Sequence, residues 1–150
     1  MKTGYKVGDC MTNNPVYVTR DTTLAECAIL MKSRKVGSLL VKEGEELQGI
    51  LTERDIVRKA VSCNASPGSL KASDIMVKDV ITIAPEKDIL DAIHEMKDYD
   101  IRHLPVKERN KLVGFITIKD ILKLQPHLFE ILADKIRLRE EERKILLCEK

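Results

Sequence analysis

The chain has 150 residues, the size of one ordinary domain, and 43% of them are hydrophobic and 33% charged, which excludes an intrinsically disordered chain. Its 26 basic and 24 acidic residues leave a formal net charge of +2, so composition gives no general attraction to nucleic acid or to an anionic membrane. No stretch approaches the roughly 18 apolar residues of a membrane span and the first residues lack a signal-peptide core, so we expect a cytoplasmic protein without a membrane partner.

The first part of the chain, residues 6–60, reads as strand, helix, strand, strand, helix. A capping box at residues 23–26, Thr-Leu-Ala-Glu, predicts the start of the first helix. Its apolar stripe consists of Leu24, Cys27, Ala28 and Met31. Alternation and turn residues predict strands at 16–18, 36–41 and 47–51. The closing helix is expected to start at Thr52.

A linker rich in turn-forming residues, 61–70, leads to a second part, residues 71–124, with the same order of elements. The first helix of this part presents Ile89, Ala92, Ile93 and Met96 on one face. Its strands are predicted at 81–83, 104–106 and 112–116. The last helix is expected to start at Thr117.

The two parts are copies of one unit. Shifting the sequence by 65 positions aligns them without a gap, and fourteen of the 54 aligned pairs are identical. Chance gives roughly one match in twenty, about three here. Because a unit of about 60 residues is marginal alone, we expect the two sheets to pack face to face around one shared core. The predicted fold is therefore α+β, with two β-α-β-β-α repeats, a pseudo-two-fold axis and two related clefts.

The segments that match best lie where a strand meets a helix, at residues 49–55 and 114–120. Their shared pattern is Gly, two apolar residues, Thr, two variable residues and Asp. The glycine would admit a ligand close to the backbone, and the threonine and the helix N-terminus would bond its phosphate. Arg54 or Lys119 adds positive charge, and the aspartate can accept both vicinal hydroxyls of a ribose. Thr-x-x-Asp is equally a helix N-cap signature, and capping and ligand binding can coexist.

These two segments, with residues 101–106, Asp9-x-Met11 and Asp74-x-Met76, resemble a tandem CBS-domain protein, named for cystathionine beta-synthase, over residues 6–124. The resemblance implies that the Thr-x-x-Asp segment of one repeat faces the first two strands of the other. Site A would then consist of Ile50, Thr52, Arg54, Asp55, Ile81, Arg102 and His103. Site B would consist of Phe115, Thr117, Lys119, Asp120, Val16, Gly37 and Ser38.

The two sites differ in charge. Arg54 and Arg102 should make site A favour phosphates. Site B has Gly37 and Ser38 where site A has Arg102 and His103, and it departs from the family pattern again at Leu40. We therefore expect site B to take a less charged ligand or none.

The resemblance implies a regulatory module whose ligand is AMP, ADP, ATP or S-adenosylmethionine, bound without any other cofactor, and which signals to an unidentified protein partner. No catalytic set of side chains is recognisable, so an enzyme is not predicted, and the four cysteines have neither metal-ligand nor disulfide spacing. Two alternatives stay open. One is a nucleic-acid binder, against which the near-neutral charge and scarce aromatics count. The other is a structural dimerisation module with vestigial sites.

Residues 125–150 lie outside the repeats and form a predicted helical tail. Its apolar stripe consists of Leu128, Ile131, Leu132 and Ile136. Such a stripe needs an apolar surface, so we expect a homodimer in which the tail packs at the subunit interface. Cys148 has no C-x-x-C partner, and no zinc site is predicted there.

Overall fold

The computed structural model describes residues 2–124, and the predicted tail at 125–150 lies outside the described residues. The helices are α1 (Val7–Cys10), α2 (Leu24–Arg34), α3 (Glu53–Asp55), α4 (Ala72–Ile75), α5 (Ile89–Asp98) and α6 (Ile118–Leu124). The strands are β1 (Tyr17–Val18), β2 (Ser38–Glu43), β3 (Glu46–Thr52), β4 (His103–Glu108) and β5 (Lys111–Thr117). A π-helical turn, η1 (Ile56–Ala60), and a 3-10 turn, η2 (Val61–Cys63), continue α3. The order matches the predicted duplication, and the mixed α+β class is confirmed.

The strand pairing repeats with the same offset of 65 residues. Ser38 faces Thr52 in the β2–β3 pair, and His103 faces Thr117 in the β4–β5 pair. Both pairs are antiparallel, and both shift register at the same place, between Val41 and Lys42 and between Val106 and Lys107. The duplication read from the sequence therefore extends to individual hydrogen-bonded partners.

The first strand of the two repeats differs. β1 pairs in parallel with β2, and the amide of Leu40 donates to the carbonyl of Val16 (3.0 Å). In the second repeat the position of Leu40 is taken by Pro105, which has no N–H to donate to Ile81. A single parallel bridge between Ile83 and Val106 remains there, so the strand predicted at 81–83 is wrong in extent.

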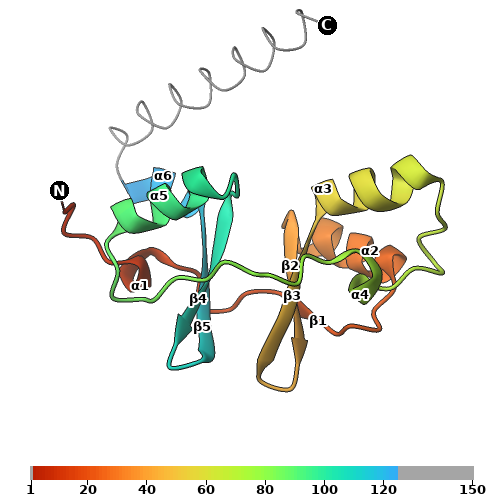
Figure 1. The fold of residues 1–150 in the computed structure, drawn as a ribbon, viewed down its shortest axis with the longest axis horizontal. Coiled ribbons are helices and arrows are strands. Elements are labelled where there is room, and N and C mark those ends of the chain that lie inside the picture. The colour runs from red at the N-terminus through yellow and green to blue at the C-terminus, as the bar shows by residue number, and fades with distance from the viewer. Residues whose placement is uncertain (1, 125–150) are drawn as a thin grey trace, which may run out of the picture.

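The short helix that opens each repeat packs on the other repeat. The amides of Val7 and Gly8 in α1 donate to the carbonyls of Lys87 and Pro85 (both 2.9 Å). The equivalent amides in α4, those of Ala72 and Ser73, donate to Thr22 and Arg20 (2.8 and 3.1 Å). Figure 1 shows α1 beside β4 and β5, and α4 beside α2. The two repeats thus exchange their leading helices.

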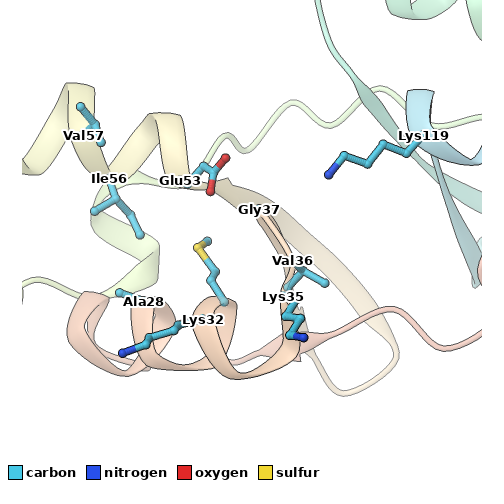
Figure 2. A pocket seen from close by; sticks show the side chains of 10 residues that line it. Ala28, Lys32, Lys35, Val36, Gly37, Glu53, Ile56, Val57 and Lys119 are labelled. Atoms are coloured by element: carbon cyan, nitrogen blue, oxygen red, sulfur yellow. The ribbon is translucent and has the colours of Figure 1, made fainter.

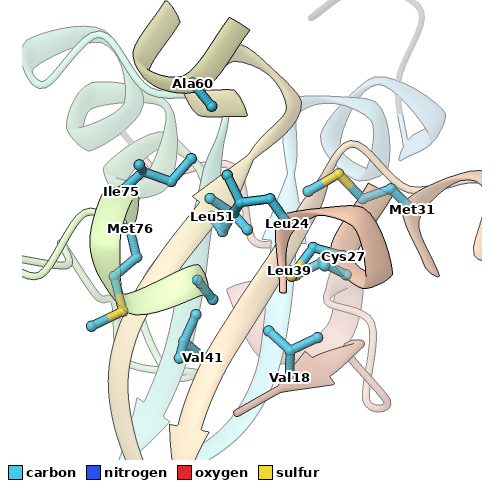
Figure 3. Close-up of a cluster of buried hydrophobic side chains, with 11 residues drawn as sticks. Val18, Leu24, Cys27, Met31, Leu39, Val41, Leu51, Ala60, Ile75 and Met76 are labelled. Carbon is cyan, nitrogen blue, oxygen red and sulfur yellow. The ribbon is translucent and has the colours of Figure 1, made fainter. Parts of the chain in front are cut away.

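The buried side chains form two clusters rather than the one shared core that was expected. Each cluster belongs to one repeat and is completed by the exchanged helix of the other. Val7 lies in the second-repeat cluster, whereas Ala72, Ile75 and Met76 lie in the first. Figure 3 shows Ile75 and Met76 in the first-repeat cluster. The sheets still face one another between the outer helices, as predicted (Figure 1).

The predicted helix stripes are buried with one exception. Leu24, Cys27 and Met31 are buried on α2, but Ala28 is exposed, although its counterpart Ile93 on α5 is buried. The predicted capping box is present, since the amide of Glu26 donates to Oγ1 of Thr23 (3.2 Å) and that of Thr23 to Glu26 (2.9 Å). Within residues 2–124, no helix has the length and apolar character needed to cross a membrane.

Candidate functional site

Both Thr-x-x-Asp segments form helix capping boxes. The amide and hydroxyl of Thr52 donate to Oδ2 of Asp55 (2.9 and 2.8 Å), and the amide of Asp55 donates back to Oγ1 of Thr52 (3.1 Å). Thr117 and Asp120 make the same three bonds (2.9, 2.8 and 3.4 Å). Because each threonine proton is donated to its aspartate, none is left for a phosphate while the cap is formed. A bond from either threonine hydroxyl to a phosphate stays a prediction, and it would require that hydroxyl to leave its aspartate.

The capping also limits what each aspartate can offer a ribose. Oδ2 of Asp55 is held by the cap, while Oδ1 lies 3.0 Å from Nζ of Lys59. In the second repeat, Oδ1 of Asp120 lies 3.8 Å from Nζ of Lys123. Each carboxylate oxygen has two lone pairs, so Oδ1 can still accept one further hydrogen bond. A ribose hydroxyl would share that oxygen with a lysine.

The space beside the glycines of the two segments is filled by protein atoms and not left open for a ligand. A Cβ on Gly49 would lie 2.7 Å from Sδ of Met76 and 2.8 Å from the carbonyl oxygen of Val77. A Cβ on Gly114 would meet Sδ of Met11 and the carbonyl oxygen of Thr12. The expectation that these glycines let a ligand approach is wrong, because the exchanged segment of the other repeat occupies the space. These contacts pair the Asp-x-Met segment of each repeat with the Gly-containing segment of the other repeat.

The same exchanged segments occupy the backbone of two predicted site residues. The amide and carbonyl of Ile50 bond to Val77 (3.0 and 2.9 Å), and those of Phe115 bond to Thr12 (2.9 and 2.8 Å). Ile50 is also buried. Only the side chain of Phe115, which is partly exposed, can face a ligand.

Site A brings residues of both repeats together around His103. The carboxylate of Asp55, from the first repeat, is close enough to His103, from the second, to raise the pKa of its imidazole, while burial lowers that pKa by more. The net effect is a pKa below the ordinary histidine value. The imidazole also stacks on the ring of Phe115, with centroids 5.8 Å apart and planes 22° apart. Phe115, which was assigned to site B, therefore contacts a residue of site A.

Arg54 and Arg102 are exposed at site A, and Ile81 is partly buried against the second-repeat core. The carbonyl of Arg102 accepts from the amide of Ile118 (3.0 Å), which fixes the start of β4 against α6. The residues assigned to site A supply two exposed guanidinium groups, the stacked ring of His103 and one carboxylate oxygen of Asp55. These groups suit an anionic ligand with a ring system.

Site B contains an open cavity of about 510 Å³ between α2, the start of α3 and the second repeat. Gly37 and Lys119 are the two predicted site residues that line it; Val16, Ser38, Phe115, Thr117 and Asp120 do not. The other lining residues are Ala28, Met31, Lys32, Lys35, Val36, Glu53, Ile56 and Val57 (Figure 2). Sequence reasoning missed Glu53, although the repeat alignment pairs it with the uncharged Ile118.

The described residues that could bind a metal or react as thiols are dispersed, and Cys10, Cys27 and Cys63 are free cysteines. Within residues 2–124, no three histidine, cysteine, aspartate or glutamate side chains are grouped as metal ligands. Burial raises the pKa of the Cys27 thiol to about 11, so that thiol stays protonated in the first-repeat core. His127 and Cys148 lie outside the described residues.

The family model described as the CBS domain matches the chain twice, at residues 7–62 and 72–127. An uncharacterized protein of Methanopyrus kandleri is 35% identical over 138 residues, which cover 91% of this chain and 70% of that protein. Inosine-5'-monophosphate dehydrogenase of Korarchaeum cryptofilum is 35% identical over 125 residues, 83% of this chain but only 25% of the enzyme.

Among solved structures, a hexameric CBS-CP12 protein from bloom-forming cyanobacteria superposes with a TM-score of 0.75 at 27% identity, covering 97% of this chain and 84% of that one. The match extends over both repeats, and the exchanged helices and paired capping boxes described above lie within the matched residues. The chain belongs to the CBS-domain family and carries two tandem copies of the domain.

Proposed function

We propose that this CBS pair is a regulatory module that binds an adenosine-containing ligand at site A and signals its presence to a protein partner. The observation that carries the proposal is the meeting of the two repeats at His103, where Asp55 of one repeat acts on the imidazole of the other. A flat ring can extend the stack of His103 and Phe115, and the ribose can donate to Oδ1 of Asp55. Arg54 and Arg102 supply charge for phosphate.

Signalling follows from the position of site A between the repeats. A ligand that contacts both Arg54 and Arg102 binds best in one arrangement of the repeats and therefore increases the population of that arrangement. A partner that contacts both repeats would read the change. The match to one quarter of inosine-5'-monophosphate dehydrogenase supports a module that serves a larger partner.

Calorimetry of the full chain with AMP, ADP, ATP and S-adenosylmethionine tests the proposal. We expect at least one of them to bind with micromolar to submillimolar affinity. No heat and no thermal shift with all four would refute it. Binding of single-stranded nucleic acid that weakens steeply with salt would instead favour the nucleic-acid alternative.

Asp55→Ala tests the ribose contact. The substitution should weaken binding by roughly 1.5–3 kcal/mol, the range for a hydrogen bond to a charged group. It also removes a helix cap, which costs about 0.5–2 kcal/mol of folding stability. Asp120→Ala is the matched control for AMP binding, because it removes the equivalent cap of the second repeat while Asp55 keeps its contacts. Equal affinities of the two variants would contradict the role of Asp55.

We also propose that the module works as a homodimer. Hexameric assembly of the CBS-CP12 protein shows that this kind of fold can support oligomers, and exposed aliphatic side chains on the first repeat favour one here.

A further inference from the structure

On the basis of the ligand-binding function proposed above, we propose that Glu53 sets the selectivity of site B. Its carboxylate excludes phosphate from the cavity around Gly37 and Lys119. Phosphate-bearing ligands then bind at site A alone, and site B takes an adenosine compound that carries no phosphate.

The backbone places residue 53 in the first repeat as it places residue 118 in the second. The amide of Glu53 donates to the carbonyl of Gly37 (2.9 Å), and the amide of Ile118 donates to that of Arg102 (3.0 Å). The two pairs are related by the repeat offset of 65. Differences between the sites at these positions therefore come from the side chains and not from the path of the chain.

The side chain of Glu53 occupies the space above Gly37. A Cβ on Gly37 would lie 3.1 Å from Oε1, 3.2 Å from Cδ and 3.4 Å from Oε2 of Glu53. The second repeat has Arg102 at the position of Gly37. Site B thus has a carboxylate over the residue where site A has a guanidinium.

Lys119 lines the same cavity from the second repeat. Figure 2 shows its side chain reaching toward Glu53 and Gly37 from the second repeat. Lys32 and Lys35 also line the cavity, but they come from α2, and Figure 2 shows them across the cavity from Lys119 and Glu53. A phosphate drawn to Lys119 therefore meets the Glu53 carboxylate as well.

Comparing equivalent positions gives the charge difference. The difference is local to the part of each site around residues 119 and 54: site A presents Arg54, Arg102 and the uncharged Ile118 there, and site B presents Lys119, Gly37 and the anionic Glu53. Lys32 and Lys35 line another part of the site B cavity. Like charges brought together repel, and a phosphate carries up to two negative charges. The apolar part of the cavity, which includes Val36, Ile56 and Val57, can hold a nucleoside without phosphate.

The test is the number of AMP molecules bound per chain, measured by calorimetry on the full chain at low ionic strength. We expect one for the unmodified protein and two for Glu53→Gln, with the second site gaining roughly tenfold or more in affinity. Glu53→Ile, which copies the second repeat, should behave alike and provides a second variant. Glu86→Gln is the control: it removes the same charge from an exposed position outside both sites, and one AMP should remain.

Methylthioadenosine, which has no phosphate, should bind to the unmodified chain even when AMP saturates site A. Arg102→Gln combined with Glu53→Gln should keep the new AMP site while weakening the original one, which assigns the new site to the cavity of Glu53. Two AMP molecules on the unmodified chain, or one on both Glu53 variants, would overturn the selectivity role. No methylthioadenosine bound in the presence of saturating AMP would overturn the ligand class. If the unmodified chain binds neither AMP nor methylthioadenosine nor any other adenosine compound tested, the proposed function itself fails.

Discussion

Gly49 and Gly114 illustrate how a residue expected to face a ligand can instead face protein. Both lie in the segments that match best between the repeats. The space that a side chain would take at each glycine is occupied by a methionine from the other repeat. The contact involves the methionine sulfur and a backbone carbonyl oxygen, and the carbonyl is itself bonded to the opposite strand. The backbone has little room to move away.

Gly49→Ala should therefore destabilise the fold. Inserting a methyl group into a tightly packed contact typically costs about 1–3 kcal/mol, and we expect a loss of that size in urea unfolding. Gly68→Ala is the control, because a Cβ there would have only Oγ of Ser66 nearby, at 4.0 Å. Equal unfolding midpoints for the two variants would show that the Gly49 contact is looser than the structure indicates.

His103 should make stability depend on pH. Burial lowers the pKa of its imidazole, and the carboxylate of Asp55 only partly offsets the shift. In the unfolded chain a histidine takes up its proton near pH 6.5. Below that pH the unfolded chain binds more protons at this position than the folded protein does, so stability falls as the pH drops from about 6.5 toward the lowered pKa.

Unfolding measured between pH 7.5 and 5 checks this, with His103→Gln removing part of the loss. His94→Gln, at an exposed position on α5, should leave the pH dependence in place. An unchanged pH profile in the His103 variant would contradict the assignment.

At the scale of elements, the exchanged helices decide how each repeat closes. Val7 in α1 is fully buried in the second-repeat cluster, and Ala72 in α4 is fully buried in the first. Neither repeat completes its own core. We therefore expect the repeats to fold and unfold as one unit, although their side chains form separate clusters.

Val7→Ala tests the exchange. It should cost about 1.5–3 kcal/mol, the value of burying one such side chain. The location of the amides whose hydrogen exchange becomes faster distinguishes the exchanged arrangement from a local one. We expect faster exchange in α5, β4 and β5, which α1 covers, rather than in α2, which is nearer in sequence. Val18→Ala, in the first-repeat cluster, is the matched control and should act mainly on α2 and β2. Faster exchange confined to α2 after Val7→Ala would rule out the exchanged arrangement.

At the scale of the whole molecule, the first repeat has an exposed apolar surface. The most exposed aliphatic side chains among the described residues are Ile29 (67%), Val61 (64%) and Val57 (58%), from α2, η2 and η1. In the second repeat, the position equivalent to Ile29 carries His94, so the apolar surface is not repeated there. The two repeats therefore differ in their outer surface as they do in their ligand sites, and the apolar surface of the first is the better candidate for subunit contact.

We expect the full chain to be a dimer in light scattering at micromolar concentrations, and Ile29→Glu with Val61→Glu to make it monomeric. Burying such side chains stabilises by roughly 1.5–3 kcal/mol each, and a charge in the interface opposes this. Tyr99→Glu, an exposed position in the second repeat, should leave the dimer intact. A full chain that is monomeric would refute the dimer. A chain ending at Gln125 that dimerises fully would refute the contribution of the tail.

The sequence by itself determined the duplication, the order of elements and the capping boxes. The elements and capping boxes follow from local patterns, namely apolar periodicity and a threonine three residues before an acidic residue. The duplication follows from the fixed offset of 65 between matching residues. The charge difference between Arg102 and Gly37 was also visible there. Local patterns predict such features because their hydrogen bonds and buried faces involve residues close in the chain.

Only the tertiary structure decided which residues fill the space beside those patterns. Met76 beside Gly49, α1 on the second repeat and Glu53 opposite Lys119 all join residues far apart in sequence. The same holds for the exposure of Ala28, whose α2 stripe reads like that of α5. An apolar stripe indicates that a helix face must be covered, and a glycine indicates that a neighbouring group lies close to the backbone. Neither pattern indicates which residues provide the cover or make the contact. That choice was made by the packing of the two repeats against one another.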